Sequence, residues 1–250
     1  METVNTNSEQ LIDKFGRTID YLRISVTDRC DFRCVYCMEE KMEFVPRAQL
    51  LTLEEISTIA RAFTELGVSK IRITGGEPLV RRNILKLFED LGQLPGLTNL
   101  VTTTNGSQLP KLASDLKQAG LKRINISLDS LDAEKFRRIT RVGDLNKVLE
   151  GIDAALAAGF EKIKINAVIL KNRNHEEVTD LVQFASERGM DLSFIEEMPL
   201  GVIDDHDRAE AYYSSDQIRE DLEKTFTLLP TTENTGGPSN YFRLAETGTL

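Results

Sequence analysis

The feature that most constrains the fold of this chain is a repeated alternation of short β-type runs with longer helical patterns. A β-type run begins shortly after each of four glycines that close apolar-periodic stretches, namely Gly67, Gly120, Gly159 and Gly189. Glycine at such a position is typical of a helix C-terminus, because a residue without a side chain adopts the left-handed conformation without strain. The repeat predicts helices that each lead into a strand.

The strand candidates number six, and helical patterns separate them. They lie at residues 22–26, 70–74, 99–103, 122–128, 162–170 and 191–196. Thr52 and Glu55 form a plausible capping box at the start of the first helical pattern. Alternating strands and helices predict a parallel sheet with right-handed crossovers. Six units are too few for a closed eight-unit barrel, so the predicted fold class is α/β, an open, partial TIM-like (βα)6 barrel.

The predicted organisation has an N-terminal arm at residues 1–15, the partial barrel at residues 16–200 and the start of a C-terminal region at residues 201–250. The last region breaks the alternation of strands and helices. It holds one predicted helix, residues 216–226, and a short apolar run, residues 241–244, after a turn-rich stretch.

Composition and charge narrow the class of protein. The chain of 250 residues is 40% hydrophobic and 28% charged, which is enough for one domain with a sizeable core. Its formal net charge of −9 argues against a broad nucleic-acid or membrane surface. The polar N-terminal residues contain no apolar run that could serve as a signal sequence. We therefore predict a cytoplasmic protein with no nucleic-acid or membrane partner.

The three cysteines, Cys30, Cys34 and Cys37, follow the first predicted strand. A parallel barrel binds its ligand at the C-terminal ends of its strands, so chemistry is expected in this loop. Three thiolates at this spacing can each hold one corner of a cubane iron–sulfur cluster, which leaves the fourth iron open to a small chelating molecule such as an amino acid. The alternatives are a redox cysteine pair and a zinc site lacking its fourth ligand. A closed structural zinc site needs four protein ligands, however, and no histidine is near.

Three cations interrupt apolar β-type runs: Arg23, Arg72 and Lys164. Side chains on a strand alternate in direction, so each of these cations points either to solvent or into the barrel. Unpaired cations inside a barrel would be costly, and a triphosphate would neutralise them. One such residue alone is typical of a solvated face, whereas three at comparable places favour a phosphate site.

Other residues near the strand ends each allow two interpretations. Gly75 and Gly76 let backbone approach a ligand and offer free peptide groups to a methionine moiety, with a plain turn as the alternative. The small hydroxyls of Thr103 and Ser127 can bind a ligand or satisfy a backbone group. Met198, taken alone, is typical of a residue that fills the core.

Four further ionisable residues are interpreted as surface residues. His175 and His206 lie among polar neighbours in the sequence, so neither is expected to be a ligand. Arg81 and Arg82 could contact an anion at the start of a helix, but a solvated pair is the simpler interpretation.

The cysteine loop, Cys30-Asp-Phe-Arg-Cys34-Val-Tyr-Cys37, resembles the CxxxCxxC signature of radical S-adenosylmethionine enzymes, including the aromatic residue before the third cysteine. Further segments are similar to the GTP 3′,8-cyclases of molybdenum cofactor biosynthesis. These segments are residues 22–30, 72–81, 102–106, 125–130 and 162–166.

The resemblance implies a reaction. A [4Fe-4S] cluster would cleave S-adenosylmethionine reductively, and the resulting 5′-deoxyadenosyl radical would abstract the ribose 3′ hydrogen of GTP, whose ribose carbon then attacks C8 of guanine. The product would be (8S)-3′,8-cyclo-7,8-dihydroguanosine 5′-triphosphate, in the first step of molybdenum cofactor (molybdopterin) biosynthesis. The implied partners are GTP, an electron donor, a second copy in a homodimer and the next enzyme of the molybdopterin pathway.

The resemblance also assigns roles to individual residues. The cluster ligands would be Cys30, Cys34 and Cys37. The residues in contact with S-adenosylmethionine would be Tyr36, Gly76, Ser127 and Met198. The residues that hold GTP would be Arg23, Arg72, Thr103 and Lys164.

Two departures from the family pattern bear on activity. The family holds a second [4Fe-4S] cluster with a CxxC and a later Cys of its C-terminal part, whereas no cysteine follows Cys37 in this sequence. We therefore expect a chain whose terminal region is missing, by truncation or by evolutionary loss, and whose activity is incomplete. Ser193 stands where the family commonly has Arg, so one charge near the ligands is absent.

Two other functions stay open at this point. One is a different radical S-adenosylmethionine enzyme that acts on a peptide or another small molecule. The other is a non-catalytic module that binds zinc through the three cysteines. Binding of GTP distinguishes the first from a cyclase, and visible absorption distinguishes the second, because zinc is colourless.

Overall fold

The computed structural model describes residues 10–160, 162–198, 203, 206–233 and 239–249. Its main feature is one sheet of six parallel strands that lie in chain order, with β1 and β6 at the edges. The strands are β1 (Tyr21–Ser25), β2 (Lys70–Thr74), β3 (Asn99–Thr104), β4 (Arg123–Ser127), β5 (Ile163–Ile169) and β6 (Asp191–Glu196). Every predicted strand end lies within one residue of the observed end. The sheet confirms the predicted α/β class and its open arrangement.

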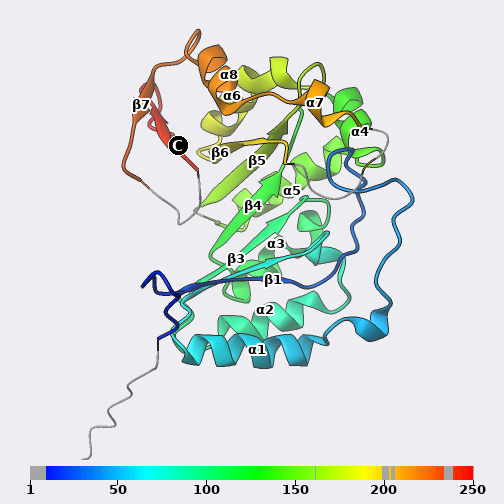
Figure 1. Ribbon diagram of the computed structural model, residues 1–250, viewed down its shortest axis with the longest axis vertical. Helices are drawn as coiled ribbons and strands as arrows, with labels where there is room; N and C mark the ends of the chain where they lie inside the picture. Colours follow the sequence, from blue (N-terminus) through cyan, green and yellow to red (C-terminus); the bar gives the residue numbers. More distant parts are fainter. Residues whose placement is uncertain (1–9, 161, 199–202, 204–205, 234–238, 250) are drawn as a thin grey trace, which may run out of the picture.

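Helices connect the strands and cover the outside of the sheet (Figure 1). They are α1 (Leu53–Glu65), α2 (Ile84–Gly92), α3 (Leu109–Gln118), α4 (Ala133–Thr140), α5 (Leu145–Ala157), α6 (Val178–Glu187), α7 (Arg208–Ala211) and α8 (Ser215–Leu222). Short 3-10 turns are η1 (Arg47–Gln49), η2 (Pro78–Val80) and η3 (His175–Glu177). In the described part of the chain, every helix is too short or too polar to cross a bilayer.

The helix ends follow the predicted chemistry. Gly67, Gly120, Gly159 and Gly189 have φ angles of 97°, 92°, 76° and 64°, which are left-handed values that favour glycine. At the start of α1, the Thr52 side chain accepts a hydrogen bond from the Glu55 N–H, and the Glu55 carboxylate accepts one from the Thr52 N–H. This reciprocal capping box confirms the predicted start of the helix.

The strands divide their side chains between two faces of the sheet. The face under the helices carries fully buried isoleucines, among them Ile71, Ile73, Ile124, Ile126 and Ile165. Burying one such side chain contributes about 2 kcal/mol, so this face fixes the sheet against its helices. The residues between these isoleucines point to the opposite, inner face, where hydroxyls, amides and cations predominate.

The C-terminal region adds a helix and an antiparallel hairpin of β7 (Leu228–Pro230) and β8 (Phe242–Leu244). The hairpin, orange and red in Figure 1, lies on the β6 side of the sheet. The predicted helix at residues 216–226 is α8, which ends earlier because the chain leaves it to pack Phe226 against the core and enter β7. The apolar run at residues 241–244 is β8 with the residue before it.

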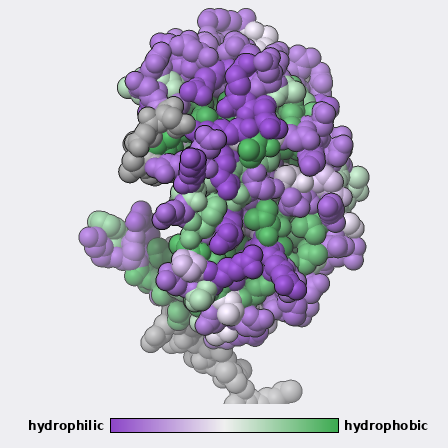
Figure 2. All heavy atoms as spheres, turned by 90° about the vertical axis from the view of Figure 1, so that its right-hand side faces the viewer, coloured by the Kyte–Doolittle hydropathy of each residue, from purple (hydrophilic) through white to green (hydrophobic). Residues whose placement is uncertain are grey.

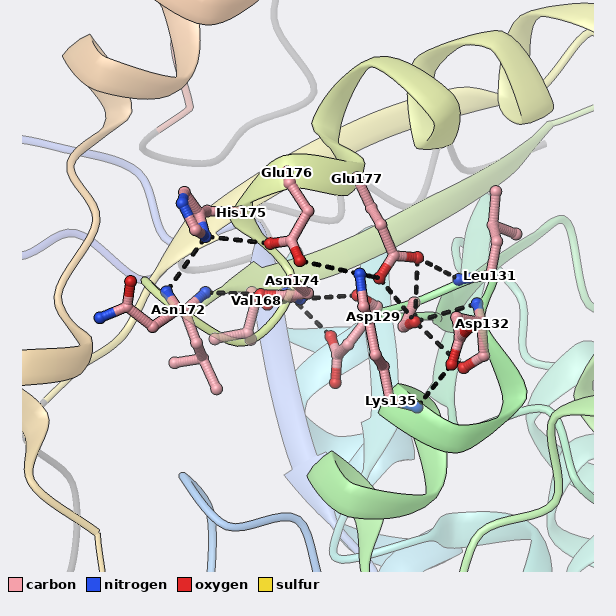
Figure 3. A network of polar contacts seen from close by, with 12 residues as sticks. Asp129, Leu131, Asp132, Lys135, Val168, Asn172, Asn174, His175, Glu176 and Glu177 are labelled. Carbon is pink, nitrogen blue, oxygen red and sulfur yellow. Dashed lines mark hydrogen bonds and ion pairs between the residues drawn. The ribbon is translucent and has the colours of Figure 1, made fainter.

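A buried polar network joins the ends of β4 and β5 (Figure 3). Asn174 is fully buried, and its Nδ2 donates to the carbonyl oxygens of Asp129 and Val168 at 2.6 and 2.9 Å. Its Oδ1 accepts from the N–H of Leu170 at 2.7 Å. The carboxylate of Glu177 accepts further hydrogen bonds from the loop after β4. The network fixes both strand ends relative to each other.

Asn174→Ala should lower the free energy of unfolding by about 2–4 kcal/mol, because three buried backbone groups lose their partner. Chemical denaturation of the purified chain measures this difference. Asn146→Ala, at an exposed position of α5, is the control and should change the stability by less than about 0.5 kcal/mol. Equal stability of the Asn174 variant and the unaltered chain would contradict the assigned role.

Candidate functional site at the strand ends and inner sheet face

The loop that follows β1 begins in close contact with the end of β2. The N–H groups of Gly76 and Glu77 donate to the carbonyl oxygens of Thr27 and Arg29 at 2.7 and 2.8 Å. A Cβ atom on Gly75 or Gly76 would collide with the same two carbonyl oxygens, so only glycine fits here. The loop engages the N–H of Gly76, which corrects the prediction that this peptide group is free for a methionine moiety.

The same loop is fixed at α4 on its other side. The Val35 N–H donates to the carbonyl oxygen of Ile139 at 2.9 Å. The rings of Phe32 and Phe136, both buried, meet edge to face with their centres 5.9 Å apart. The loop is therefore held between β2 and α4 by contacts within the protein.

The three cysteines lie on this loop and differ in exposure. Cys30 and Cys34 are half-buried, whereas Cys37 is exposed. The Sγ atom of Cys30 accepts a hydrogen bond from the N–H of Phe32 at 3.3 Å. Burial raises the pKa of Cys30 to about 11. Burial also raises the pKa of Cys34 well above its usual range, and the charges of the neighbouring thiols raise the pKa of Cys34 further. These mutual effects indicate that the three thiols lie near one another.

The donor set of this loop fits an iron–sulfur cluster. A structural zinc site usually takes four protein ligands. A cubane cluster can take three thiolates, one at each of three irons, when the fourth iron is open to a small ligand. Three cysteines on one loop, none in a disulfide, fit that donor set.

Tyr36 reaches from the loop to the end of β4. Its hydroxyl donates to Oδ2 of Asp129 at 2.7 Å, and Oδ1 of the same carboxylate accepts from the N–H of Val168 at 2.8 Å. Burial raises the pKa of Asp129 to about 6, and burial together with the Asp129 charge raises the pKa of Tyr36. Half-buried Ser127 ends β4. The structure thus brings two of the predicted site residues, Tyr36 and Ser127, to one strand end.

Glu77 is a site residue that the sequence prediction missed. It is 1% exposed, and its carboxylate accepts hydrogen bonds from Leu79 N–H at 2.9 Å, Thr104 Oγ1 at 2.7 Å and Asn105 N–H at 2.6 Å. Burial raises the pKa of Glu77 to about 7, although these bonds lower it. The Asn105 side chain donates to the Sγ atom of Cys30 at 3.8 Å, so Glu77 holds the loop after β3 against the cysteine loop. The Gly-Gly-Glu-Pro sequence was the available signal.

Cations gather on the inner face of the sheet. Strand pairing places Arg23 directly beside Arg72. Arg72 donates from Nε to the Tyr21 hydroxyl and from Nη1 to the Thr103 hydroxyl, both at 2.8 Å. Arg72 therefore links β1, β2 and β3, whereas Arg23 is exposed. Three of the four residues predicted to hold GTP lie together here.

Two further cations on this face, Lys70 and Arg123, were not predicted as site residues. Lys70 lies two residues before Arg72 on β2. Arg123 on β4 is in register with Arg72, because both residues pair with Val101 on β3. Burial lowers the pKa of both, and the charges of Arg72 and Arg123 lower the pKa of Lys70 further. Nη2 of Arg123 lies 4.0 Å from Oδ2 of Asp191. Cations that lower one another's pKa mark a place where a bound anion is stabilised.

Lys164 completes this group of cations and is only 3% exposed. Its Nζ donates to the hydroxyl of Tyr241 at 3.1 Å and lies 4.6 Å from the centre of the Tyr241 ring. Asn125 on β4 and Asp191 on β6 are its neighbours across the sheet. Of the two directions that the sequence allows, solvent or barrel interior, the structure shows Lys164 pointing away from solvent.

Two predictions of surface residues are wrong. His206 is 7% exposed, and its Nε2 lies 2.8 Å from Oε1 of buried Glu197, so the tertiary partner outweighs its polar sequence neighbours. Arg81 donates to the carbonyl oxygens of Val26, after β1, and Leu51, before α1, so it is bonded to the protein and is not part of a solvated pair.

The remaining predicted residues lie apart from these groups. Met198 follows β6 and is 55% exposed, so it does not fill the core. His175 is half-buried, with its ring 5.1 Å from the ring of Tyr213.

Figure 2 views the side on which the strands end, and hydrophilic residues cover most of it with smaller apolar areas between them. The exposed apolar residues of the segment between Cys37 and α1 are Met42, Val45 and Leu51.

Comparison with known proteins agrees with this architecture. Residues 24–185 match the family described as the Radical SAM superfamily. SuiB of Streptococcus suis bound to S-adenosylmethionine is similar with a TM-score of 0.66 and 22% identity, over 82% of this chain and 47% of that chain. Coproporphyrinogen III oxidase of Escherichia coli, described as a radical SAM enzyme, is similar with a TM-score of 0.57 and 18% identity, over 82% of this chain and 50% of that chain. This chain spans about half of those two proteins. The class is thus a radical SAM protein.

Curated relatives are much more similar in sequence. The GTP 3′,8-cyclase of Pseudomonas syringae pv. syringae is 60% identical over 236 residues, which cover 94% of this chain and 71% of that protein. The GTP 3′,8-cyclase of Marinobacter nauticus is 58% identical over 237 residues, which cover 95% of this chain and 72% of that protein. The chain belongs to the GTP 3′,8-cyclase family of the radical SAM superfamily.

The raised pKa of Glu77 predicts a pH-dependent stability. Its folded value of about 7 lies above the ordinary value of 4.5, so the folded chain binds this proton more tightly than the unfolded chain does. Protonated Glu77 therefore contributes to the free energy of unfolding below about pH 4.5, and this contribution is lost as the pH rises to about 7. The loss amounts to about 3 kcal/mol.

Glu77→Gln should remove this pH dependence, although the new amide opposes the Asn105 N–H and lowers stability throughout. Urea unfolding of both chains at several pH values between about 5 and 7.5 gives the difference. Glu89→Gln, at an exposed position of α2, should keep the slope of the unaltered chain. An unchanged slope in the Glu77 variant would show that its carboxyl does not titrate in this range.

Proposed function

We propose that this chain carries out the GTP 3′,8-cyclase reaction, which converts GTP to (8S)-3′,8-cyclo-7,8-dihydroguanosine 5′-triphosphate. The observation that carries the proposal is the arrangement of two groups on one sheet. The cysteine loop lies at the C-terminal ends of the strands, and cations line the inner face below it. With S-adenosylmethionine bound at the cluster and the triphosphate bound by the cations, the ribose of GTP would lie between the cluster and the cations. The activity named for the relatives supports the same assignment.

The cysteine loop would hold the cofactors. Cys30, Cys34 and Cys37 would ligate one [4Fe-4S] cluster. When bound, the cluster and S-adenosylmethionine supply the 5′-deoxyadenosyl radical that abstracts the ribose 3′ hydrogen. Tyr36 and Ser127 lie at the end of β4, where they can orient S-adenosylmethionine. Gly76 would line the same space from the end of β2, and Met198 from the end of β6.

The inner face would hold GTP by its phosphates. Arg72 and Thr103 are already hydrogen-bonded to each other, so their side chains are oriented before a ligand arrives. Buried Lys164 and exposed Arg23 contribute charge from β5 and β1. Each charge-assisted bond to a phosphate oxygen is stronger than a neutral one, which favours an anion with several charges.

Some expectations from the sequence and from the family resemblance stay predictions. These are the division at residues 15 and 200, the homodimer, the electron donor, the next enzyme of the pathway and the cytoplasmic location. All three cysteines of the sequence lie between residues 30 and 37, so we propose one cluster for this chain, with no cysteine left for a second. Ser193 pairs with Asn166 across β5 and β6, and its hydroxyl cannot supply the charge of an arginine.

Iron content tests the cluster. After anaerobic reconstitution the chain should hold about four irons and absorb visible light as a cubane cluster does. Alanine at any one of Cys30, Cys34 and Cys37 should remove most of the iron, because each thiolate holds one corner. Met42→Leu, an exposed change on the same loop, should leave the iron content unchanged. A colourless protein that retains zinc would contradict the assignment.

GTP binding tests the substrate. Lys164→Met should weaken equilibrium binding of GTP to the reconstituted chain at least about tenfold, because a buried cation no longer meets the phosphates. Lys122→Met, at an exposed position before β4, should have no such effect. Cleavage of S-adenosylmethionine by a chain that does not bind GTP would sink the cyclase assignment. That result would favour another radical S-adenosylmethionine enzyme, acting on a peptide or a different small molecule.

A further inference from the structure

The C-terminal hairpin brings a tyrosine to the inner face of the sheet. Tyr241 directly precedes β8 and is half-buried. Its hydroxyl accepts the hydrogen bond from Lys164, and the centre of its ring lies 4.6 Å from the same ammonium group. Lys70 and Arg123 lie near the same phenol. One side chain from the end of the chain thus contacts Lys164, which is assigned to the triphosphate, and lies near two further cations of the inner face.

The hairpin is anchored, so the position of Tyr241 is set by the fold. Leu244 on β8 is 6% exposed and pairs with Leu228 on β7, and both belong to the main core. Beyond β8, the Thr247 hydroxyl accepts a hydrogen bond from Ser186 of α6 at 2.8 Å. These contacts tie the segment that carries Tyr241 to the outer helices of the barrel.

We propose that Tyr241 is a substrate-positioning residue, which fixes the ammonium group of Lys164 and closes one side of the triphosphate site. The inference rests on the proposed function. An ammonium group has three N–H donors, so one can bond the phenol while the others bond phosphate oxygens. A buried cation is attracted to an aromatic ring more strongly than an exposed one, and Lys164 is 3% exposed. Without the phenol, the long lysine side chain loses its fixed orientation, and phosphates bind more weakly.

Graded variants test the role. Equilibrium titration of the reconstituted chain with GTP, and separately with inorganic tripolyphosphate, gives the affinities. Tyr241→Phe keeps the ring and removes the hydrogen bond, so both affinities should fall about threefold. Tyr241→Ala removes both contacts, and the affinities should fall about tenfold or more. Leu229→Ala, at an exposed position of β7, is the matched control on the hairpin and should bind both ligands as the unaltered chain does.

A double variant separates positioning from a structural role. Because Tyr241 acts through Lys164, Tyr241→Ala should weaken tripolyphosphate binding little further in a Lys164→Met background. Additive losses, or unchanged affinities in the single variants, overturn the assignment while the cyclase proposal stands. If the alanine variant does not fold, the phenylalanine variant decides by the same comparison. An unaltered chain that binds neither GTP nor tripolyphosphate overturns the inference and the proposed function together.

Discussion

Positive charge on the inner face of the sheet is the constraint on which the site depends. Lys164 and Arg72 find hydroxyl partners in Tyr241, Tyr21 and Thr103. A hydroxyl satisfies an N–H donor but does not cancel the charge, so these hydrogen bonds leave the positive charge of both side chains in place. The isoleucines on the opposite face, packed under the helices, stabilise the sheet and offset this cost. An anion with several charges is the ligand that such a face stabilises most.

The cysteine loop is likewise held in place by contacts within the protein, separate from the thiols proposed to bind the cofactor. Its backbone approaches the glycine pair at the end of β2 so closely that no side chain fits, and its middle is bonded to α4. Asn105 at the end of β3, held by Glu77 from the end of β2, supports it as well. A loop held on three sides loses little conformational freedom when it takes up a cofactor, so more of the binding energy is left for affinity.

Local features of the fold could be predicted from the sequence because they have local causes. The glycine at each helix end and the capping box of Thr52 and Glu55 depend on neighbouring residues alone. Glu77 was missed because its partners come from another strand, and the burial that shifts its pKa is a tertiary property. His206 was assigned to the surface from its polar neighbours, but Glu197 and the surrounding fold bury it. Tyr241 lies 77 residues from Lys164 in the sequence, and no periodicity connects them.

The open edge of the sheet explains why the C-terminal hairpin matters to the inner face. Six strands do not close on themselves, so the strands near each edge depend on other segments for cover. Near the β6 edge, Tyr241 of the segment that leads into β8 contacts Lys164 on the adjacent strand β5, which is 3% exposed. At the other edge Arg23 on β1 is exposed to solvent. Charge interactions strengthen as water is excluded, so the charge of buried Lys164 would attract an anion more strongly than the charge of exposed Arg23. Under the proposed function, the hairpin would therefore influence where along the inner face a triphosphate is held most firmly.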